Sequence, residues 1–87
     1  MRFPTIHLNG TSYTALHTEY MEAYEAVRAA IDALQKVTVH GRDYYVQEGN
    51  AASEAYAEHH ERLRALEKVK SDLEKIIINL INQKETR

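Results

Sequence analysis

One uninterrupted stretch decides the fold: residues 52–83, ASEAYAEHHERLRALEKVKSDLEKIIINLINQ. It contains neither Gly nor Pro and is rich in Ala, Leu, Glu, Lys and Arg, which form helices readily. Its mostly apolar positions recur at alternating spacings of three and four, the pattern of a helix packed lengthwise on another helix. We therefore expect one long helix with a single buried face. That face comprises Ala52, Tyr56, His59, Leu63, Leu66, Lys70, Leu73, Ile77 and Leu80.

A second amphipathic pattern precedes it and predicts a partner helix. Thr11 or Ser12 is suited to cap its N-terminus. Small Ala23 and Ala30 would allow a second helix to approach closely, and Tyr24 and Ile31 flank the apolar face. The expected face comprises Tyr13, Leu16, Tyr20, Ala23, Val27, Ala30, Leu34 and Val37.

The two patterns together predict a mainly all-α fold, an antiparallel two-helix hairpin. At 87 residues the chain is expected to be a single domain. Its parts are an extended N-terminal segment, a first helix, an ordered connector and a second helix. The connector can be an irregular loop or can hold a small β-hairpin about His40–Asp43. The expected ranges are 1–11, 12–37, 38–51 and 52–84 in that order.

Composition excludes several classes of protein. The formal net charge is −2, which argues against a protein that binds nucleic acid or a membrane surface through its overall charge. The chain has no Cys, so a disulfide scaffold, a Cys-based zinc site and a Cys nucleophile are excluded. Its first residues lack the apolar core of a signal peptide, and its longest apolar run, Ile76–Ile78, is too short to span a bilayer. We expect a cytoplasmic protein.

The end of the second helix predicts an oligomer. If Val37 lies opposite Ala52, the residues after Ile77 extend beyond the first helix, and they are apolar nearly all the way round. Either the N-terminal segment of the same chain or a second copy must cover them. A lone two-helix hairpin also buries little surface, so we favour a homo-oligomer, a dimer or higher. The expected interface residues are Ile76, Ile77, Ile78, Leu80 and Ile81.

Two polar segments have the chemistry of a phosphate-ligand site. The first places Gly and hydroxyl groups at a helix N-terminus, where free N–H groups attract anions. The second offers a guanidinium for phosphate, a carboxylate for a hydroxyl and aromatic faces for a base. The alternatives are an ordinary turn with its N-cap, and a loop whose tyrosines close the hairpin. The expected ligand-binding residues are Asn9, Gly10, Thr11, Ser12, Arg42, Asp43, Tyr44 and Tyr45.

These two segments are far apart in a single hairpin. A first helix of about 24 residues is about 36 Å long. The short N-terminal segment therefore cannot reach its own connector, whereas in an antiparallel pair it can reach the connector of the other chain.

The remaining polar residues do not form a recognisable catalytic or metal site. His59 and His60 are adjacent, so they do not share a helix face, and no His follows four positions later. We expect His59 to be a hydrogen-bonded histidine in an interface. The sequence shows no triad order, paired carboxylates or Gly-rich phosphate loop. We therefore expect no enzymatic activity, no metal and no cofactor.

The runs Pro4–Ser12 and Gly41–Tyr45, followed by Glu58-His59, Arg62-Leu63 and Leu66, resemble a group of short phage and prophage proteins. The resemblance implies a phage-encoded accessory protein without enzymatic activity, acting in the bacterial host cytosol. Small helical-hairpin phage proteins include oligomeric sponges that sequester nucleotide signals of defence systems such as Thoeris and CBASS, and this chain is similar in size and shape class. The leading hypothesis is an oligomer that binds a small phosphorylated or nucleotide ligand between subunits. The alternative is a module that binds a host or phage protein.

Overall fold

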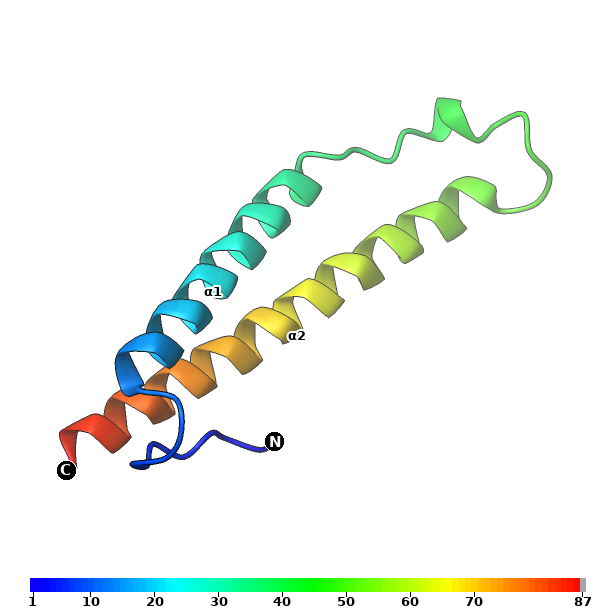
Figure 1. Ribbon diagram of the computed structural model, residues 1–87. Helices are drawn as coiled ribbons and strands as arrows, with labels where there is room; N and C mark the ends of the chain where they lie inside the picture. The colour runs from blue at the N-terminus through cyan, green and yellow to red at the C-terminus, as the bar shows by residue number, and fades with distance from the viewer. Residues whose placement is uncertain (87) are drawn as a thin grey trace.

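The computed structural model describes residues 1–86, which form a long, thin helical hairpin (Figure 1). Helix α1 spans Tyr13–Gln35, the 3₁₀ helix η1 spans Gly41–Asp43, and α2 spans Ala51–Glu85. The two α-helices run antiparallel, and the N-terminal segment folds back beside the last turns of α2 (Figure 1). The predicted mainly-α hairpin is confirmed, and each α-helix begins and ends within two residues of its expected bounds.

The hairpin is far from compact. Its extents are 61 × 21 × 19 Å and its radius of gyration is 19.0 Å, against about 12 Å for a globular domain of this length. Its accessible surface is 6617 Å², whereas a compact protein of 10.0 kDa exposes about 5,200 Å². The chain therefore exposes about 1,400 Å² more than its mass requires.

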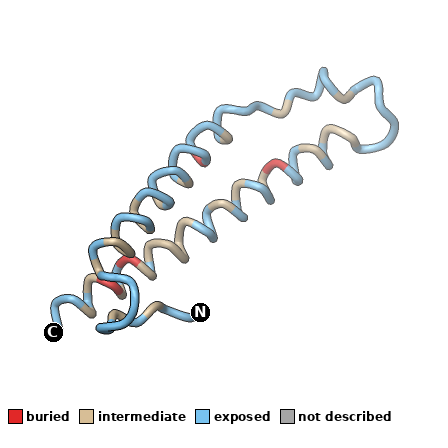
Figure 2. The backbone as a smooth tube through the Cα atoms, in the orientation of Figure 1, coloured by how far each residue is buried: buried red, intermediate tan, exposed pale blue. Residues whose placement is uncertain are grey.

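The core is correspondingly thin (Figure 2). Within residues 1–86 the buried apolar side chains are Ile31 on α1 and Ile77 and Leu80 on α2, and Leu80 is wholly inaccessible. The rest of the contact between the helices consists of half-buried side chains. On α1 these include Leu16, Tyr20, Tyr24, Val27 and Leu34, and on α2 Leu63, Leu66, Leu73 and Ile76.

The inward face of α1 differs from the expected one. Ala23 and Ala30 are exposed, while Tyr24 is half-buried and Ile31 is buried. The helix is thus rotated so that its larger side chains meet α2. Burying a large apolar side chain stabilises the fold by more than the close approach of two alanines does, since the gain scales with apolar area. The predicted role of Ala23 and Ala30 was wrong for this contact.

One hydrogen bond joins the two helices across this contact. The Tyr24 hydroxyl donates to Glu74 Oε1 at 2.8 Å. This bond raises the pKa of Tyr24 above its usual value of 10.0, and partial desolvation and the negative charge of Glu74 act in the same direction. The folded chain therefore favours the protonated phenol.

Alkaline pH should weaken this link between the helices. Because the pKa of Tyr24 is higher in the folded chain, its contribution to stability is complete below about pH 10 and is lost as the pH rises through the folded pKa. We expect Tyr24 to ionise above the usual phenol pKa of 10.0, as a late step in a tyrosinate absorbance titration. Tyr24→Phe should remove this late step, whereas Tyr45→Phe, at a side chain that is 78% exposed, should leave it. A late step that survives Tyr24→Phe would contradict the assignment.

The N-terminal segment is held against the end of α2 by Gln83. Its Oε1 accepts from the Ile6 backbone N–H at 2.9 Å, and its Nε2 donates to the Pro4 carbonyl at 2.8 Å. The same Nε2 donates to Asn79 Oδ1 at 2.7 Å. One side chain thus binds two backbone groups of the segment, the Pro4 carbonyl and the Ile6 N–H, and fixes where the segment crosses the helix.

The N-terminal segment lies beside the apolar end of α2, which was expected to be covered either by this segment or by a second copy of the chain (Figure 1). The single chain itself buries Ile77 and Leu80, and their expected place at a subunit interface stays a prediction. Ile76 and Ile81 are half-buried, and Ile78 is 57% exposed. The cover is therefore one-sided, and Ile78 remains on the open side.

The connector is ordered without strands. Over the described residues no strand is formed, so the β-hairpin alternative about His40–Asp43 is wrong. Asp43 N–H donates to the His40 carbonyl at 3.1 Å and Tyr44 N–H donates to Gly41 at 2.9 Å, closing successive turns of a 3₁₀ helix. Gly49 then takes a φ of +74°, a conformation that favours glycine, immediately before α2 begins.

Candidate functional site

The two predicted ligand segments lie at opposite ends of the hairpin (Figure 1). Asn9–Ser12 precedes the start of α1, and Arg42–Tyr45 lies in the connector beyond its end. The 23 residues of α1 separate them by about 35 Å. All of these residues are exposed except Tyr44, which is half-buried. A single chain therefore does not bring the two segments together.

The first segment is a tight turn followed by a helix cap. Gly10 N–H donates to the His7 carbonyl at 3.1 Å, which closes a four-residue turn. The His7 ring lies over Gly10 so closely that a Cβ there would meet His7 Nε2 at 2.7 Å. Ser12 is the N-cap of α1, and its Oγ accepts from Ala15 N–H at 3.1 Å. The ordinary turn-and-cap role is present, and it leaves the Asn9 and Thr11 side chains exposed.

The second segment exposes its charged residues. Arg42 and Asp43 are exposed within η1, and the ion pairs of residues 1–86 join other side chains. Tyr44 is half-buried and Tyr45 is 78% exposed, so the two tyrosines differ in their access to solvent. The Arg42 guanidinium and the Tyr45 ring are therefore accessible on the same short loop.

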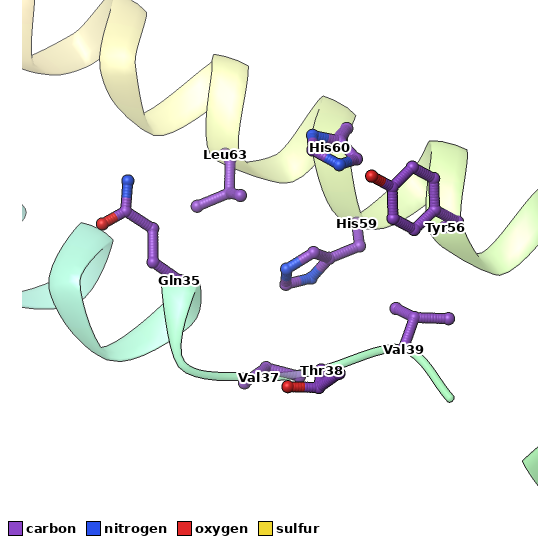
Figure 3. Close-up of a pocket in the computed structure, with 8 residues that line it drawn as sticks. All are labelled: Gln35, Val37, Thr38, Val39, Tyr56, His59, His60 and Leu63. Carbon is purple, nitrogen blue, oxygen red and sulfur yellow. The ribbon is translucent and has the colours of Figure 1, made fainter. Parts of the chain in front are cut away.

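A cavity that the sequence reasoning missed lies between the start of the connector and α2 (Figure 3). Its volume is about 410 Å³, within the range of small-molecule and side-chain pockets. The chain leaves helical geometry at Gln35 and runs past α2 in extended form, which opens the space. The β-branched run Val37-Thr38-Val39 was the available signal for this early helix end. The cavity is lined by Gln35, Val37, Thr38, Val39, Tyr56, His59, His60 and Leu63.

His59 lies at the centre of this cavity wall (Figure 3). Its side chain is buried, as its place on the apolar face of α2 predicts. The hydrogen bonds among the described side chains do not include the expected one to its ring. The neighbouring His60 ring packs edge-on to Tyr56 with a centroid distance of 4.4 Å. Valine side chains of the connector thus line one side of the cavity, and the His59 imidazole of α2 lines the other (Figure 3).

The structure gives no positive sign of a metal site or of membrane insertion. Within residues 1–86, no three His, Asp or Glu side chains gather as a metal site would require. Neither α1 nor α2, as far as they are described, contains a segment with the length and apolar character needed to cross a bilayer. Comparison of the chain with protein-family models, curated proteins and solved structures found no match.

Proposed function

We propose that the protein is a non-enzymatic homo-oligomer of helical hairpins that binds a small phosphorylated or nucleotide ligand between its subunits. The observation that carries the oligomer is the excess of about 1,400 Å² of exposed surface over a compact protein of the same mass. A standard protein interface removes about 800 Å² from each partner. One such interface on each chain would therefore remove a large part of this excess.

Exposed apolar side chains on the connector and on α2 support the same proposal. Ile78 and Tyr56 on α2 are each 57% exposed, and Val37 beyond α1 is 54% exposed. Burying these side chains in an interface would contribute about 25 cal/mol of stabilisation per Å² of apolar area. A second hairpin laid along the first would cover them.

The ligand part of the proposal depends on the arrangement of the subunits. In an antiparallel pair, the Asn9–Thr11 turn of one chain lies beside Arg42 and Tyr45 of the other. The turn would supply amide and hydroxyl donors, the guanidinium would bind phosphate oxygens, and the phenol ring would stack on a base. Two equivalent sites would form, one at each end of the pair.

Light scattering and calorimetry test the two parts separately. At micromolar concentration we expect a mass that is a multiple of 10.0 kDa. Titration with cyclic dinucleotides and with ADP-ribose should show saturable binding to the wild type. Arg42→Gln should weaken that binding at least tenfold, whereas Arg64→Gln, at an exposed position on α2, should not. A monomer would contradict the oligomer, and an oligomer that binds none of these molecules would contradict the ligand.

A module that binds a host or phage protein remains the second candidate. It is favoured by Ile78, which the N-terminal segment leaves exposed. If this candidate is correct, one bacterial protein should be retained by the wild type and lost with Ile78→Asp, with no nucleotide bound.

A further inference from the structure

The turn that precedes α1 carries an unusually exposed leucine. Leu8 is 96% exposed, and it is one of the two central residues of the turn closed by Gly10 N–H and the His7 carbonyl. Two hydrogen bonds fix the segment before the turn: the Ile6 N–H donates to Gln83, and Gln83 donates to the Pro4 carbonyl. Leu8 is thus a large aliphatic side chain displayed on a constrained support. Docking this side chain would order little additional backbone.

At the other end of the hairpin, the cavity has the shape and chemistry to receive such a side chain. Its volume of about 410 Å³ is ample for a leucine side chain with neighbouring atoms of its turn. Val37, Val39 and Leu63 supply apolar walls. Tyr56 and Val37 remain more than half exposed at its rim. A pocket with apolar walls and a partly exposed rim suits an anchor side chain from a partner.

Charge favours bringing these two ends together. Residues 38–61, at the connector end, contain one Arg and five Asp or Glu, a formal charge of −4. Residues 1–12 and 76–86, at the opposite end, contain Arg2, Lys84 and Glu85, a formal charge of +1. An antiparallel pair places each acidic end beside a basic end, whereas a parallel pair places the two acidic ends together.

We infer that the occupant of this cavity is Leu8 of a second copy of the chain, so that two hairpins lock antiparallel by exchanging turns. The partner copy would thus contribute a residue to the cavity. The arrangement is two-fold symmetric: each chain offers one Leu8 and one cavity, so both contacts are satisfied and the assembly closes as a dimer. The inference rests on the proposed homo-oligomer and specifies its orientation and its anchor.

A pair of introduced cysteines tests this arrangement directly, because the chain has none of its own. The double variant Leu8→Cys/Val37→Cys places one thiol on the turn and one on the cavity wall. Within one chain they lie at opposite ends of α1, about 35 Å apart, far beyond the Cα separation of 4.4–6.8 Å that a disulfide spans. Mild oxidation should give a covalent dimer on a non-reducing denaturing gel, while each single variant should stay non-covalent.

Other results of the oxidation experiment would indicate other arrangements of the subunits. A covalent dimer of Leu8→Cys alone would mean a parallel pair, and a ladder of larger species would mean an open chain of subunits. Both would overturn the inference. So would a wild-type dimer in light scattering whose double variant forms no covalent dimer, and in that case the proposed homo-oligomer would stand. A wild-type monomer would overturn both.

A surface substitution gives an independent readout. Leu8→Asp leaves the packing of the single chain unchanged, because the side chain is 96% exposed. It should nevertheless raise the dimer dissociation constant at least tenfold in sedimentation equilibrium. Val69→Asp, at a side chain that is 45% exposed on α2 and outside the cavity, should change it less than threefold. Equal effects of the two substitutions would overturn the anchor role of Leu8.

Discussion

Leu80→Ala is expected to lower the free energy of unfolding by about 2–5 kcal/mol, the largest effect of any single truncation in this chain. Leu80 is the one fully buried large side chain among the described residues. Its truncation would leave a void in the core, and few other side chains are buried, so little of the lost packing could be recovered. Because small domains are stable by only about 5–15 kcal/mol, the variant should lose much of its helicity near body temperature.

The matched control is Val69→Ala on the same helix. Val69 is 45% exposed, so its truncation should cost less than about 1 kcal/mol. Urea unfolding followed by circular dichroism, at one fixed chain concentration, would compare the two. Equal losses would mean that the core does not lie where the structure places it.

Gln83→Leu is expected to cost about 1–3 kcal/mol and to release the N-terminal segment. The substitution keeps the bulk of the side chain while it removes both bonds to the backbone of Pro4 and Ile6. The bonded groups are partly buried, and an amide or carbonyl left without a partner loses stabilisation of this order. The Ile6 amide, whose N–H binds Gln83, should exchange with solvent much faster than in the wild type.

Asn82→Leu, at the exposed neighbouring position, is the control for Gln83→Leu. It should leave both the melting temperature and the exchange of the Ile6 amide close to those of the wild type. An unchanged Ile6 exchange rate in Gln83→Leu would show that other contacts hold the segment.

The helices could be predicted from the sequence because their signals are local. Ser12 as a cap, the absence of Gly and Pro over residues 52–83 and the spacing of the leucines each act within a few turns. The rotation of α1 could not be predicted in the same way. Tyr24 and Ile31 lie next to Ala23 and Ala30 on the helix surface, and only the packing against α2 decides which pair turns inward.

The cavity and the fixed N-terminal segment depend on contacts between distant parts of the chain. Gln83 binds Pro4 across 79 positions, and no pattern in either segment specifies that pairing. The cavity needs the helix to end at Gln35 so that Val37–Val39 can pass His59. The helix was expected to continue to residue 37, so this space was not foreseen. The residues of the two polar segments could be picked out from the sequence by their chemistry. The distance between the two segments is set by the length of α1.

The slenderness of the hairpin has a hydrodynamic consequence. A body about three times longer than it is wide, as extents of 61 × 21 × 19 Å imply, meets more friction in water than a sphere of equal mass. A single chain would therefore emerge early from a sizing column and tumble slowly about its short axes. Antiparallel pairing would thicken this rod while lengthening it little, so the friction of a pair would be closer to that of a sphere of equal mass than the friction of a single chain is.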